Sequence, residues 1–553
     1  MLKPWLNQYQ AEVPHEINPS QYGSLAAMLD EAFLKFSDRP AFHNMGKTLT
    51  YREIDHLSKA FGCYLTKKLG LVKGDRVAIM MPNLLQYPVV LYGILRTGLI
   101  AVNVNPLYTP RELEHQLKDS GAKAIVILTN FAHTLEQVIE NTPIEQVVLT
   151  EIGDLLGGLK KNLVNFVVKR VKRMVPAFHL AGTVPLLKAL KLGQGQSLPK
   201  VTIASEDIAF LQYTGGTTGV SKGAILTHRN MVANVLQASS WIGHTFEEGK
   251  EVVITPLPLY HIFSLTANCL FGAKIGSLNV LITNPRDFPA FIKELKAWKF
   301  TFFTGVNTLF LALMNQPGFD EIDFKPLKIA LGGGMAVTRS VATEWQKRTG
   351  HVLLEAYGLT ETSPAACINP TNLQEFNGFI GLPISSTLVQ LLDDDENPVP
   401  KGQSGELCIK GPQVTQGYWQ KEEETAHVFT KDGWLKTGDI AEMNEEGYIK
   451  LVDRKKDMIL VSGFNVFPNE IEDVVSLHEG VLEVAAVGVA DEKAGEVVKI
   501  FVVKKDKTLT AGDVMDYCRK NLTGYKRPKF IEFMDELPKT NVGKILRRAL
   551  RAP

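Results

Sequence analysis

The residues best suited to chemistry lie in one stretch, YTGGTTGVSKG, which runs from Tyr213 to Gly223. Its glycines let backbone N–H groups approach a polyphosphate, its hydroxyls add hydrogen-bond donors, and Lys222 adds positive charge. The apolar run IAFLQ before it predicts a strand that delivers the loop to a sheet edge. Because Lys222 is followed by Gly223 instead of Ser or Thr, the stretch is not a Walker P-loop. We expect a phosphate-binding loop of another kind, with an ordinary glycine-rich turn as the alternative.

A second cluster lies in the strand and turn HVLLEAYGLTETS, which contains Tyr357, Thr360 and Glu361. An aromatic ring suits stacking on a base, a hydroxyl suits contact with phosphate, and a carboxylate suits coordination of Mg²⁺. The structural alternative is a core tyrosine beside a solvated glutamate. The glycine-rich stretch upstream favours the functional interpretation.

Further signals are weak when each is taken alone. Three glycines, Gly332 to Gly334, follow an apolar strand and permit a ligand to lie against the backbone. Asp439 lies in GWLKTGDIA, where a carboxylate on a tight turn can accept both hydroxyls of a ribose. His261 lies in TPLPLYHIFSL, and Lys544 lies in the basic tail LPKTNVGKILRRA. Without context, a plain turn explains Asp439 and a solvated charge explains Lys544.

Length and composition limit the possible functions. With 553 residues, the chain suggests roughly two to four domains or subdomains. Its 60 basic and 59 acidic residues give no field that favours nucleic acid, and no motif for base readout occurs, so we expect no nucleic-acid partner. The five cysteines are far apart without a CxxC pair, which indicates a reducing compartment. The amino terminus lacks the apolar core of a signal peptide, so we expect cytoplasmic residence.

Two segments raise the question of membrane contact. Residues 252–273 contain no Asp, Glu, Lys or Arg, but two prolines, His261 and Asn268 interrupt them, so we expect a buried strand, loop and helix. The run KKNLVNFVVKRVKRMV predicts a basic amphipathic helix that could lie on the inner face of the cell membrane. A surface helix packed on the core remains equally open. The predicted apolar face excludes Phe166 and consists of Val164, Val167, Val168, Val171, Met174 and Val175.

The order of elements predicts the architecture. Helix-like and strand-like pieces alternate between Tyr22 and Asp119, which indicates an α/β layer with a largely parallel sheet. Beyond Gly381, short alternating strands indicate a small antiparallel sheet or β-barrel. The charged run DRKKD at 453–457 marks a candidate hinge before a smaller α+β unit. We expect an N-terminal domain at 1–453, with two α/β layered subdomains and the small barrel, and a mobile C-terminal domain at 454–553.

Taken together, the motifs resemble those of the adenylate-forming superfamily of acyl-CoA synthetases, adenylation domains and luciferases. Within it, the chain is most similar to bacterial long-chain fatty-acid–CoA ligases, which LVNFVVKRVKRMVPAFHL also favours. Luciferases carry an additional lysine where this chain has Leu460, so light emission is disfavoured. The motifs that carry the resemblance occur in the expected order: YTGGTTGVSKG, PLPLYHIF, GGGMAV, YGLTET, GWLKTGD, DRKKDMILVSGFNVFPNEIE and PKTNVGKILRR.

The resemblance implies a role for each matching residue. It implies that Glu361 ligates Mg²⁺, that Lys544 bridges the substrate carboxylate and the α-phosphate, and that His261 lines the junction of acyl tunnel and nucleotide. Lys456 would be the hinge residue, and a loop near Gly463 would replace Lys544 before CoA enters. The implied phosphate loop is Thr214, Gly215, Gly216, Thr217, Thr218, Gly219 and Lys222. The other implied nucleotide contacts are Gly333, Gly334, Tyr357 on adenine, Gly358, Thr360 on phosphate, and Asp439 and Arg454 on ribose.

The implied activity is ATP-dependent formation of a long-chain acyl-adenylate with loss of pyrophosphate, followed by transfer to CoA with release of AMP. Two alternatives remain open at this point. The acyl group could pass to a carrier protein instead of CoA, or the chain could bind acyl groups and nucleotide without turnover. A homodimer and the preferred acyl-chain length also stay open.

Overall fold

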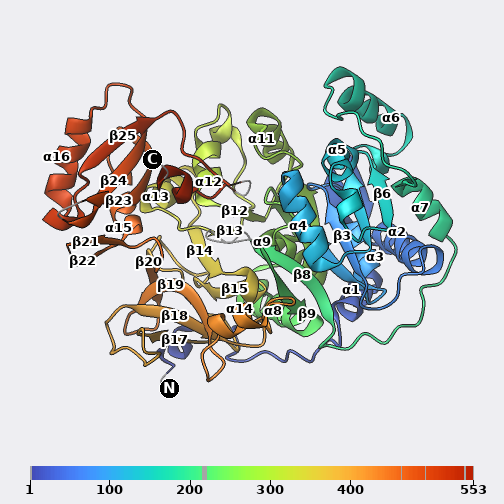
Figure 1. Ribbon diagram of the computed structural model, residues 1–553, viewed down its shortest axis with the longest axis horizontal. Helices are drawn as coiled ribbons and strands as arrows, with labels where there is room; N and C mark the ends of the chain where they lie inside the picture. Colours follow the sequence, from blue (N-terminus) through green and yellow to red (C-terminus); the bar gives the residue numbers. More distant parts are fainter. Residues whose placement is uncertain (1–2, 215–220, 463, 492–493, 541–542, 552–553) are drawn as a thin grey trace.

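A computed structural model of the protein describes residues 3–214, 221–462, 464–491, 494–540 and 543–551. The described strands form four sheets, three in a large N-terminal part and one in a smaller C-terminal part (Figure 1). The fold is therefore mixed α/β with a large and a small domain, as the sequence predicts.

A seven-stranded sheet in the order β7-β6-β5-β3-β4-β8-β9 is parallel except for its edge strand β9. Strands β8 and β9 form an antiparallel hairpin with β9 at the sheet edge, and β8 is the strand predicted before the glycine-rich stretch. The seven strands are β3 Arg76–Met80, β4 Ile100–Asn103, β5 Ala124–Leu128, β6 Gln146–Thr150, β7 Val184–Pro185, β8 Ile208–Thr214 and β9 Lys222–Thr227.

A nine-stranded sheet in the order β16-β15-β14-β13-β12-β10-β11-β1-β2 forms the second layer. Its central strands are parallel and buried, which explains their near-continuous apolar runs. The strands are β1 Pro40–Asn44, β2 Lys47–Thr50, β10 Val252–Thr255, β11 Leu278–Leu281, β12 Phe302–Gly305, β13 Ile329–Gly333, β14 Leu353–Gly358, β15 Ala365–Ile368 and β16 Leu382–Pro383.

Helices cover both sheets, and threonine caps begin several of them. The hydroxyl of Thr227 accepts from the backbone of Asn230, whose side chain reaches back to the backbone of Thr227. The range 252–273 folds as a buried strand, a loop and helical turns, as predicted. The helices of the large domain are α1 Leu25–Lys35, α2 Tyr51–Cys63, α3 Gln86–Leu95, α4 Pro110–Ser120, α5 Ala132–Glu136, α6 Gly158–Phe166, α7 Leu186–Gly193, α8 His228–Ile242, α9 Ile262–Ser264, α10 Phe271–Ile275, α11 Phe288–Ala297, α12 Asn307–Met314, α13 Arg339–Thr349 and α14 Glu422–Val428.

Short turns of π- and 3₁₀-helix connect or extend these elements. The π-helical turns are η2 Tyr64–Lys68, η6 Val167–Val171 and η8 Leu265–Leu270. The 3₁₀ turns are η1 Pro4–Gln8, η3 Thr129–Phe131, η4 Ile139–Asn141, η5 Asp154–Leu156, η7 Gly243–Thr245, η9 Phe319–Glu321, η10 Thr360–Thr362 and η11 Gly524–Lys526.

The small sheet that follows is antiparallel in the order β17-β18-β19-β20. The sequence predicts a small antiparallel sheet or β-barrel here, and the described strands form an open sheet, because β17 and β20 do not pair with each other. Its strands are β17 Leu388–Leu392, β18 Gly405–Lys410, β19 Leu435–Met443 and β20 Ile449–Arg454.

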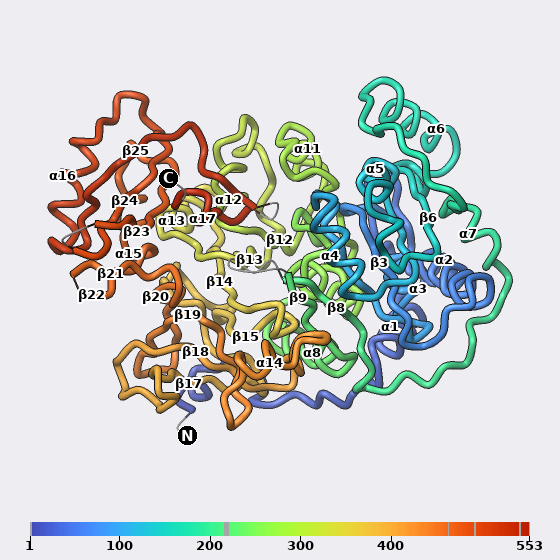
Figure 2. Tube along the Cα trace, in the orientation of Figure 1, coloured from blue at the N-terminus to red at the C-terminus, as the bar shows by residue number. Residues whose placement is uncertain are grey.

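The C-terminal part is a separate α+β unit, drawn in red in Figure 1. The chain passes into it from the end of β20, which contains the first two residues of the run DRKKD (Figure 2). Its buried apolar cluster lies between the sheet and the helices α15 and α16. The elements are β21 Ile459–Val461, β22 Phe464–Val466, α15 Pro468–Ser476, β23 Val481–Asp491, β24 Gly495–Lys504, α16 Ala511–Asn521, β25 Phe530–Met534 and α17 Arg547–Arg551.

The basic amphipathic segment forms a lobe, residues 157–183, in which no residue is buried (Figure 1). Of the predicted apolar face, Val164, Val167, Val168 and Val175 are half-buried, whereas Val171 and Met174, which end or follow the π-turn η6, are exposed. Val164 packs on the core, whereas Phe166 is 59% exposed. The exposed large apolar side chains of the lobe are Leu159, Leu163, Phe166, Val171 and Met174.

None of the helices in the described ranges is long and apolar enough to cross a membrane. The five cysteines are all buried and free.

Candidate active site

One cavity of about 1440 Å³ is lined by residues of the large domain and of the C-terminal domain. All seven predicted motifs contribute to its wall. The predicted site residues on the wall are Thr214, Lys222, His261, Gly333, Gly334, Tyr357, Gly358, Thr360, Glu361, Asp439, Arg454 and Lys544. Gly215, Gly216, Thr217, Thr218, Gly219 and Gly463 lie outside the described residues.

The ends of the glycine-rich stretch are held by the β8–β9 hairpin. Thr214 and Lys222 face each other as the last residue pair of this hairpin. The ammonium of Lys222 forms an ion pair with Glu424 of α14 and lies 5.4 Å from the ring centroid of Tyr418. Two antiparallel strands thus direct a hydroxyl and a positive charge toward the same side of the cavity.

Tyr357, Asp439 and Arg454 form one connected group. The hydroxyl of Tyr357 on β14 donates to Asp439 Oδ2 at 2.6 Å, and Arg454 Nε lies 3.3 Å from Asp439 Oδ1. Asp439 and Arg454 are opposite each other in the β19–β20 ladder, so the sheet itself sets their separation. Burial and the charge of Asp439 raise the pKa of Tyr357 far above its ordinary value, which keeps its hydroxyl a donor.

Glu361 lies in the turn η10, directly after β14. Its Oε1 accepts a hydrogen bond from the hydroxyl of Tyr418 at 2.6 Å, and its backbone carbonyl accepts from Thr415 N at 2.7 Å. No group of three or more His, Cys, Asp or Glu side chains able to hold a metal occurs among the described residues. A cation at Glu361 would therefore need oxygen ligands from a bound substrate or from water in addition to this carboxylate.

The glycines of the wall have steric reasons to be glycine. A Cβ on Gly333 would lie 3.0 Å from the carbonyl oxygen of Ala356, and one on Gly358 would lie 1.8 Å from that of Pro364. Gly334 has a φ of 77°, in the left-handed region that favours glycine. Gly358 is thus required by the approach of two backbone segments, and Gly333 and Gly334 keep the cavity wall free of side chains.

Lys544 and His261 are two further titratable groups on the cavity wall. Loss of solvent in the cavity, helped by the charge of Arg454, lowers the pKa of Lys544 to about 8, while Asp439 and Glu361 oppose the shift. Burial and the charge of Lys544 lower the pKa of His261 to about 3. At neutral pH the lysine is mostly charged and the imidazole is neutral.

Three residues near the site escape the motif-based prediction. Tyr418 and Glu424 contact Glu361 and Lys222, and both lie in the stretch GYWQKEEETAHVF, whose charged run gives the only sequence signal. Glu355 on β14 is 5% exposed and accepts from Val337 N at 3.0 Å. Burial raises the pKa of Glu355 to about 8. The sequence signal that could have identified Glu355 is a carboxylate inside the apolar strand LLEAYG.

The family "AMP-binding enzyme" matches residues 29–419, and "AMP-binding enzyme C-terminal domain" matches residues 470–544. The chain therefore belongs to the AMP-binding enzyme family.

A relative and two solved structures make the likeness more specific. A long-chain-fatty-acid–CoA ligase of Escherichia coli O6:H1 is 59% identical over 551 residues, covering 100% of this chain and 98% of the relative. ATP-bound MatB from Rhodopseudomonas palustris is 26% identical with a TM-score of 0.78, covering 95% of this chain and 98% of MatB. The anthranilate CoA ligase AuaEII with anthranoyl-AMP has a TM-score of 0.86 at 24% identity, covering 97% and 98% of the two chains, which supports the fold alone.

Proposed function

We propose that the protein activates a long-chain fatty acid with ATP, releasing pyrophosphate, and then transfers the acyl group from the acyl-adenylate to CoA, releasing AMP. The observation that supports this most directly is that Lys544 shares one cavity with Tyr357, Asp439, Arg454 and Glu361. The E. coli relative at 59% identity is itself named a long-chain-fatty-acid–CoA ligase. The substrate class of this chain is inferred from that name and from the apolar part of the cavity wall.

The cavity has the size and lining for a nucleotide and an acyl chain together. Its volume of about 1440 Å³ exceeds the roughly 300–1,000 Å³ of most single-ligand pockets. Tyr357 would stack on adenine, Asp439 and Arg454 would bind ribose, and Thr214, Thr360 and Lys222 would contact phosphates. Part of the remaining lining is apolar and comes from α8 and the η8–α10 segment: Ala238, Ile242, Ala267 and Phe271.

The donor set around Glu361 fits Mg²⁺. This ion usually binds through one or two carboxylates together with substrate phosphates and water, and Glu361 offers one carboxylate on the cavity wall. When bound, the ion would neutralise part of the phosphate charge. To reach it, Glu361 would exchange its hydrogen bond from Tyr418 for the metal.

In the first half-reaction, the fatty-acid carboxylate attacks the α-phosphate, so two anions must approach each other. The ammonium of Lys544 would bridge both and offset their repulsion, and the surrounding wall would hold them in line. The neutral imidazole of His261 adds no second charge at the junction with the acyl group. The attack forms one C–O–P linkage and breaks the bond to pyrophosphate.

In the second half-reaction, the CoA thiol attacks the acyl carbonyl and AMP leaves. Lys544 then has no task at the reacting atoms, and its position blocks space that CoA needs. We infer that residues 454–553 are a domain that rotates on residues 453–457 relative to residues 1–453, with Lys456 as the hinge residue. Rotation would withdraw Lys544 and bring the segment near Gly463 to the cavity.

The experiment that tests this function measures both half-reactions on the purified full chain. We expect pyrophosphate release with ATP, Mg²⁺ and palmitate, and AMP release from acyl-adenylate only when CoA is added. If AMP release required an acyl carrier protein, that protein instead of CoA would be the acceptor. If ATP and palmitate bound without release of pyrophosphate, the protein would be a binding protein without turnover. A panel of fatty acids of increasing length would define the preferred chain.

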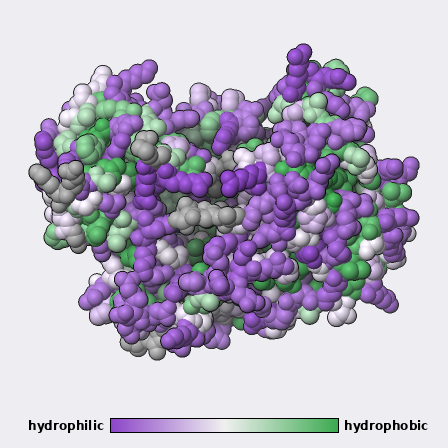
Figure 3. All heavy atoms as spheres, viewed as in Figure 1, coloured by the Kyte–Doolittle hydropathy of each residue, from purple (hydrophilic) through white to green (hydrophobic). Residues whose placement is uncertain are grey.

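We also propose that the lobe at 157–183 binds anionic membrane surfaces, where a long-chain fatty acid is dissolved. Between Leu155 and Ser205 the chain has nine Lys and Arg and no Asp or Glu, whereas the entire chain is balanced at 60 to 59. The exposed Leu159, Leu163 and Phe166 recur at intervals of four and three, so they share one helical face. Hydrophilic side chains cover much of this lobe, with hydrophobic ones among them (Figure 3).

Each basic residue near an anionic surface adds roughly 1 kcal/mol of attraction, which suits reversible binding. Replacing Lys169, Arg170, Lys172 and Arg173 by Gln should lower co-sedimentation with phosphatidylserine-containing vesicles and weaken its salt dependence. Phe166→Ser should lower vesicle binding as well, whereas Val164→Ser should destabilise the lobe. Turnover of a short, water-soluble fatty acid should stay unchanged in the charge variant. Unchanged vesicle binding would contradict the proposal.

A further inference from the structure

The segment that carries Lys544 continues into a buried cluster of charges. Three residues after the lysine, Arg547 begins α17, and its guanidinium lies against Glu472 of α15. Nε and Nη2 of Arg547 lie 3.1 and 2.7 Å from the two carboxylate oxygens of Glu472, and Nη2 also donates to Asn469 Oδ1 at 2.7 Å. Such bidentate pairing holds the guanidinium in one orientation.

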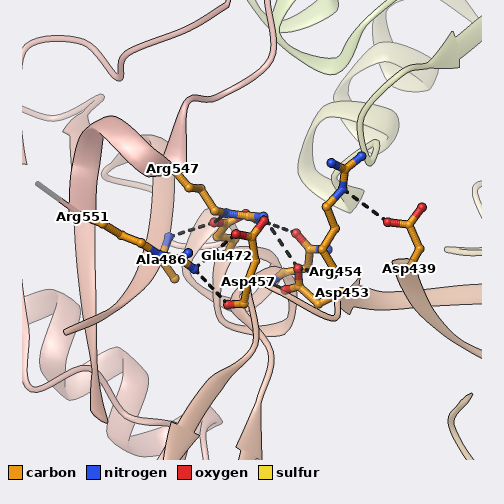
Figure 4. A network of polar contacts seen from close by, with 9 residues as sticks. Asp439, Asp453, Arg454, Asp457, Glu472, Ala486, Arg547 and Arg551 are labelled. Atoms are coloured by element: carbon orange, nitrogen blue, oxygen red, sulfur yellow. Dashed lines mark hydrogen bonds and ion pairs between the residues drawn. The ribbon is translucent and has the colours of Figure 1, made fainter. Parts of the chain in front are cut away.

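Two aspartates of the DRKKD run face the other side of the same guanidinium. Nη1 of Arg547 lies 3.7 Å from Asp453 Oδ1 and 3.7 Å from Asp457 Oδ2, and Arg551 lies 3.2 Å from Asp457. Figure 4 shows these side chains converging, while Arg454 points the opposite way, toward Asp439. Adjacent residues of β20 thus face two different partners: Arg454 faces the cavity group and Asp453 faces the C-terminal domain.

Asp453 makes a second contact with the C-terminal domain. The helix α15 has no side-chain cap of its own, because Phe467 precedes it. Instead, Asp453 Oδ2 accepts from the backbone N–H of Asn469, in the first turn of α15, at 2.9 Å. A carboxylate at this end of a helix satisfies a free N–H group and meets the positive end of the helix dipole.

We propose that Asp453 is a positioning residue for adenylate formation, which docks the C-terminal domain by pairing with Arg547 and capping α15, and so sets Lys544 in the cavity. This inference rests on the proposed function and on the proposed hinge at 453–457. Asp453 is the first residue of this hinge and still belongs to strand β20 of the large domain, whereas Arg547, Glu472 and Asn469 belong to the domain after the hinge. Rotation of that domain would break both contacts of Asp453 and leave the Arg547–Glu472 pair intact.

The side chain of Asp453 has no exposed surface. Because burial removes the hydration of its carboxylate, part of the favourable energy of the docking contact is cancelled, and the contact is easier to reverse. Burial raises the pKa of Asp453 to about 6, although Arg547 and the Asn469 N–H act in the opposite direction. An ionised carboxylate in this position therefore loses solvation on docking and regains it when the domain leaves. Such a contact can hold Lys544 during the first half-reaction without trapping it there.

The test compares Asp453 with Glu470 of α15 in the full-length enzyme. Asp453→Asn keeps an oxygen for the Asn469 N–H but removes the charge that faces Arg547, and Asp453→Ala removes both contacts. Adenylate formation, measured by pyrophosphate release, should fall about tenfold in Asp453→Asn and further in Asp453→Ala. Thioester formation from synthetic acyl-adenylate and CoA should stay within about twofold of wild type.

The control variant is Glu470→Gln, which removes the charge that pairs with Lys526 at 2.7 Å inside the C-terminal domain. It should leave both half-reactions within about twofold of wild type, because an exposed pair within one domain does not act across the hinge. The KM for ATP gives a second readout: it should stay unchanged in Asp453→Asn, and a rise would show disturbance of the adjacent Arg454 instead of lost docking.

Two results would overturn the proposal: equal loss of both half-reactions in Asp453→Asn and Asp453→Ala, or no loss in either variant. Absence of both half-reactions in the wild-type protein would instead contradict the proposed function. The outcomes of the two proposals are therefore distinguishable.

Discussion

The two walls of the cavity are built in different ways. Tyr357 and Asp439 lie on strands that have paired neighbours on both sides, and Arg454 lies opposite Asp439 in register. Lys544 lies outside any strand or helix, and its N–H donates to the hydroxyl of Thr540 at 3.0 Å. Thr308 Oγ1 of the large domain donates to the carbonyl of Gly543 at 3.0 Å. The sheets thus fix the wall that we propose binds nucleotide, whereas the location of the lysine depends on how the C-terminal domain is docked.

The largest effect should come from removing the lysine. Lys544→Ala should lower adenylate formation by about 10²–10³-fold, because this lysine is the cation proposed to bridge the carboxylate and the α-phosphate. Thioester formation from pre-made acyl-adenylate should be largely spared, since we propose a role for the lysine in the first step alone. Lys539→Ala is the matched control, because Lys539 pairs with Glu483 of β23. Equal loss of both half-reactions in Lys544→Ala would remove the role given to this lysine.

The next effect should come from the hinge. Lys456→Pro fixes φ at the position where we expect the domain to rotate, so thioester formation should fall about tenfold or more, with a smaller effect on adenylate formation. Lys456→Ala removes the same side chain without restricting the backbone and should behave like wild type. Rapid-quench measurement of each half-reaction separates the two steps. A greater loss of adenylate formation than of thioester formation in Lys456→Pro would contradict the hinge.

The sequence predicts the fixed wall better than the docked one. Residues such as Tyr357, Asp439 and Glu361 lie in short motifs, and the residue types in these motifs indicate a chemical role. The strands that carry or precede these residues are predicted by apolar periodicity. Contacts that join distant segments leave no such pattern. Asp453 and Arg547 are 94 positions apart, and Lys222 and Glu424 are 202 apart, so only the folded chain brings them together.

The local errors have local causes. The sequence places Val171 and Met174 on the same face as Val164, because a regular helical period was assumed across the π-turn η6, but Val164 packs on the core whereas Val171 and Met174 are exposed. A barrel and an open antiparallel sheet share the same alternation of apolar and polar residues, so the pattern of β17 to β20 could not decide between them. The domain boundary at 453–454 and the individual site roles stay predictions.

A smaller effect is expected from a change at Tyr357, in the wall that we propose binds nucleotide. Tyr357→Phe keeps the ring for stacking but removes the hydroxyl that donates to Asp439. Because this hydrogen bond holds the Asp439 carboxylate in the position proposed to bind ribose, the KM for ATP should rise by up to about tenfold. Tyr448→Phe, a change outside the cavity wall, is the control. A lower rate of adenylate formation with an unchanged KM for ATP would place the hydroxyl in catalysis instead of binding.

The smallest effect concerns the pH dependence of adenylate formation, which should follow the protonation of Lys544. The pKa of Lys544 is lowered from its ordinary value to about 8, chiefly by burial and then by Arg454. Because the charged form is the active one, kcat/KM for adenylate formation should be highest below about pH 8 and fall as pH rises through this pKa. One unit above the pKa about one-tenth of the lysine remains protonated, which predicts a roughly tenfold loss near pH 9.

Lys544→Arg should be slower at neutral pH but lose no further activity up to about pH 9, since guanidinium stays charged. Thioester formation should lack this decline, and the same alkaline decline in Lys544→Arg would assign it to another group.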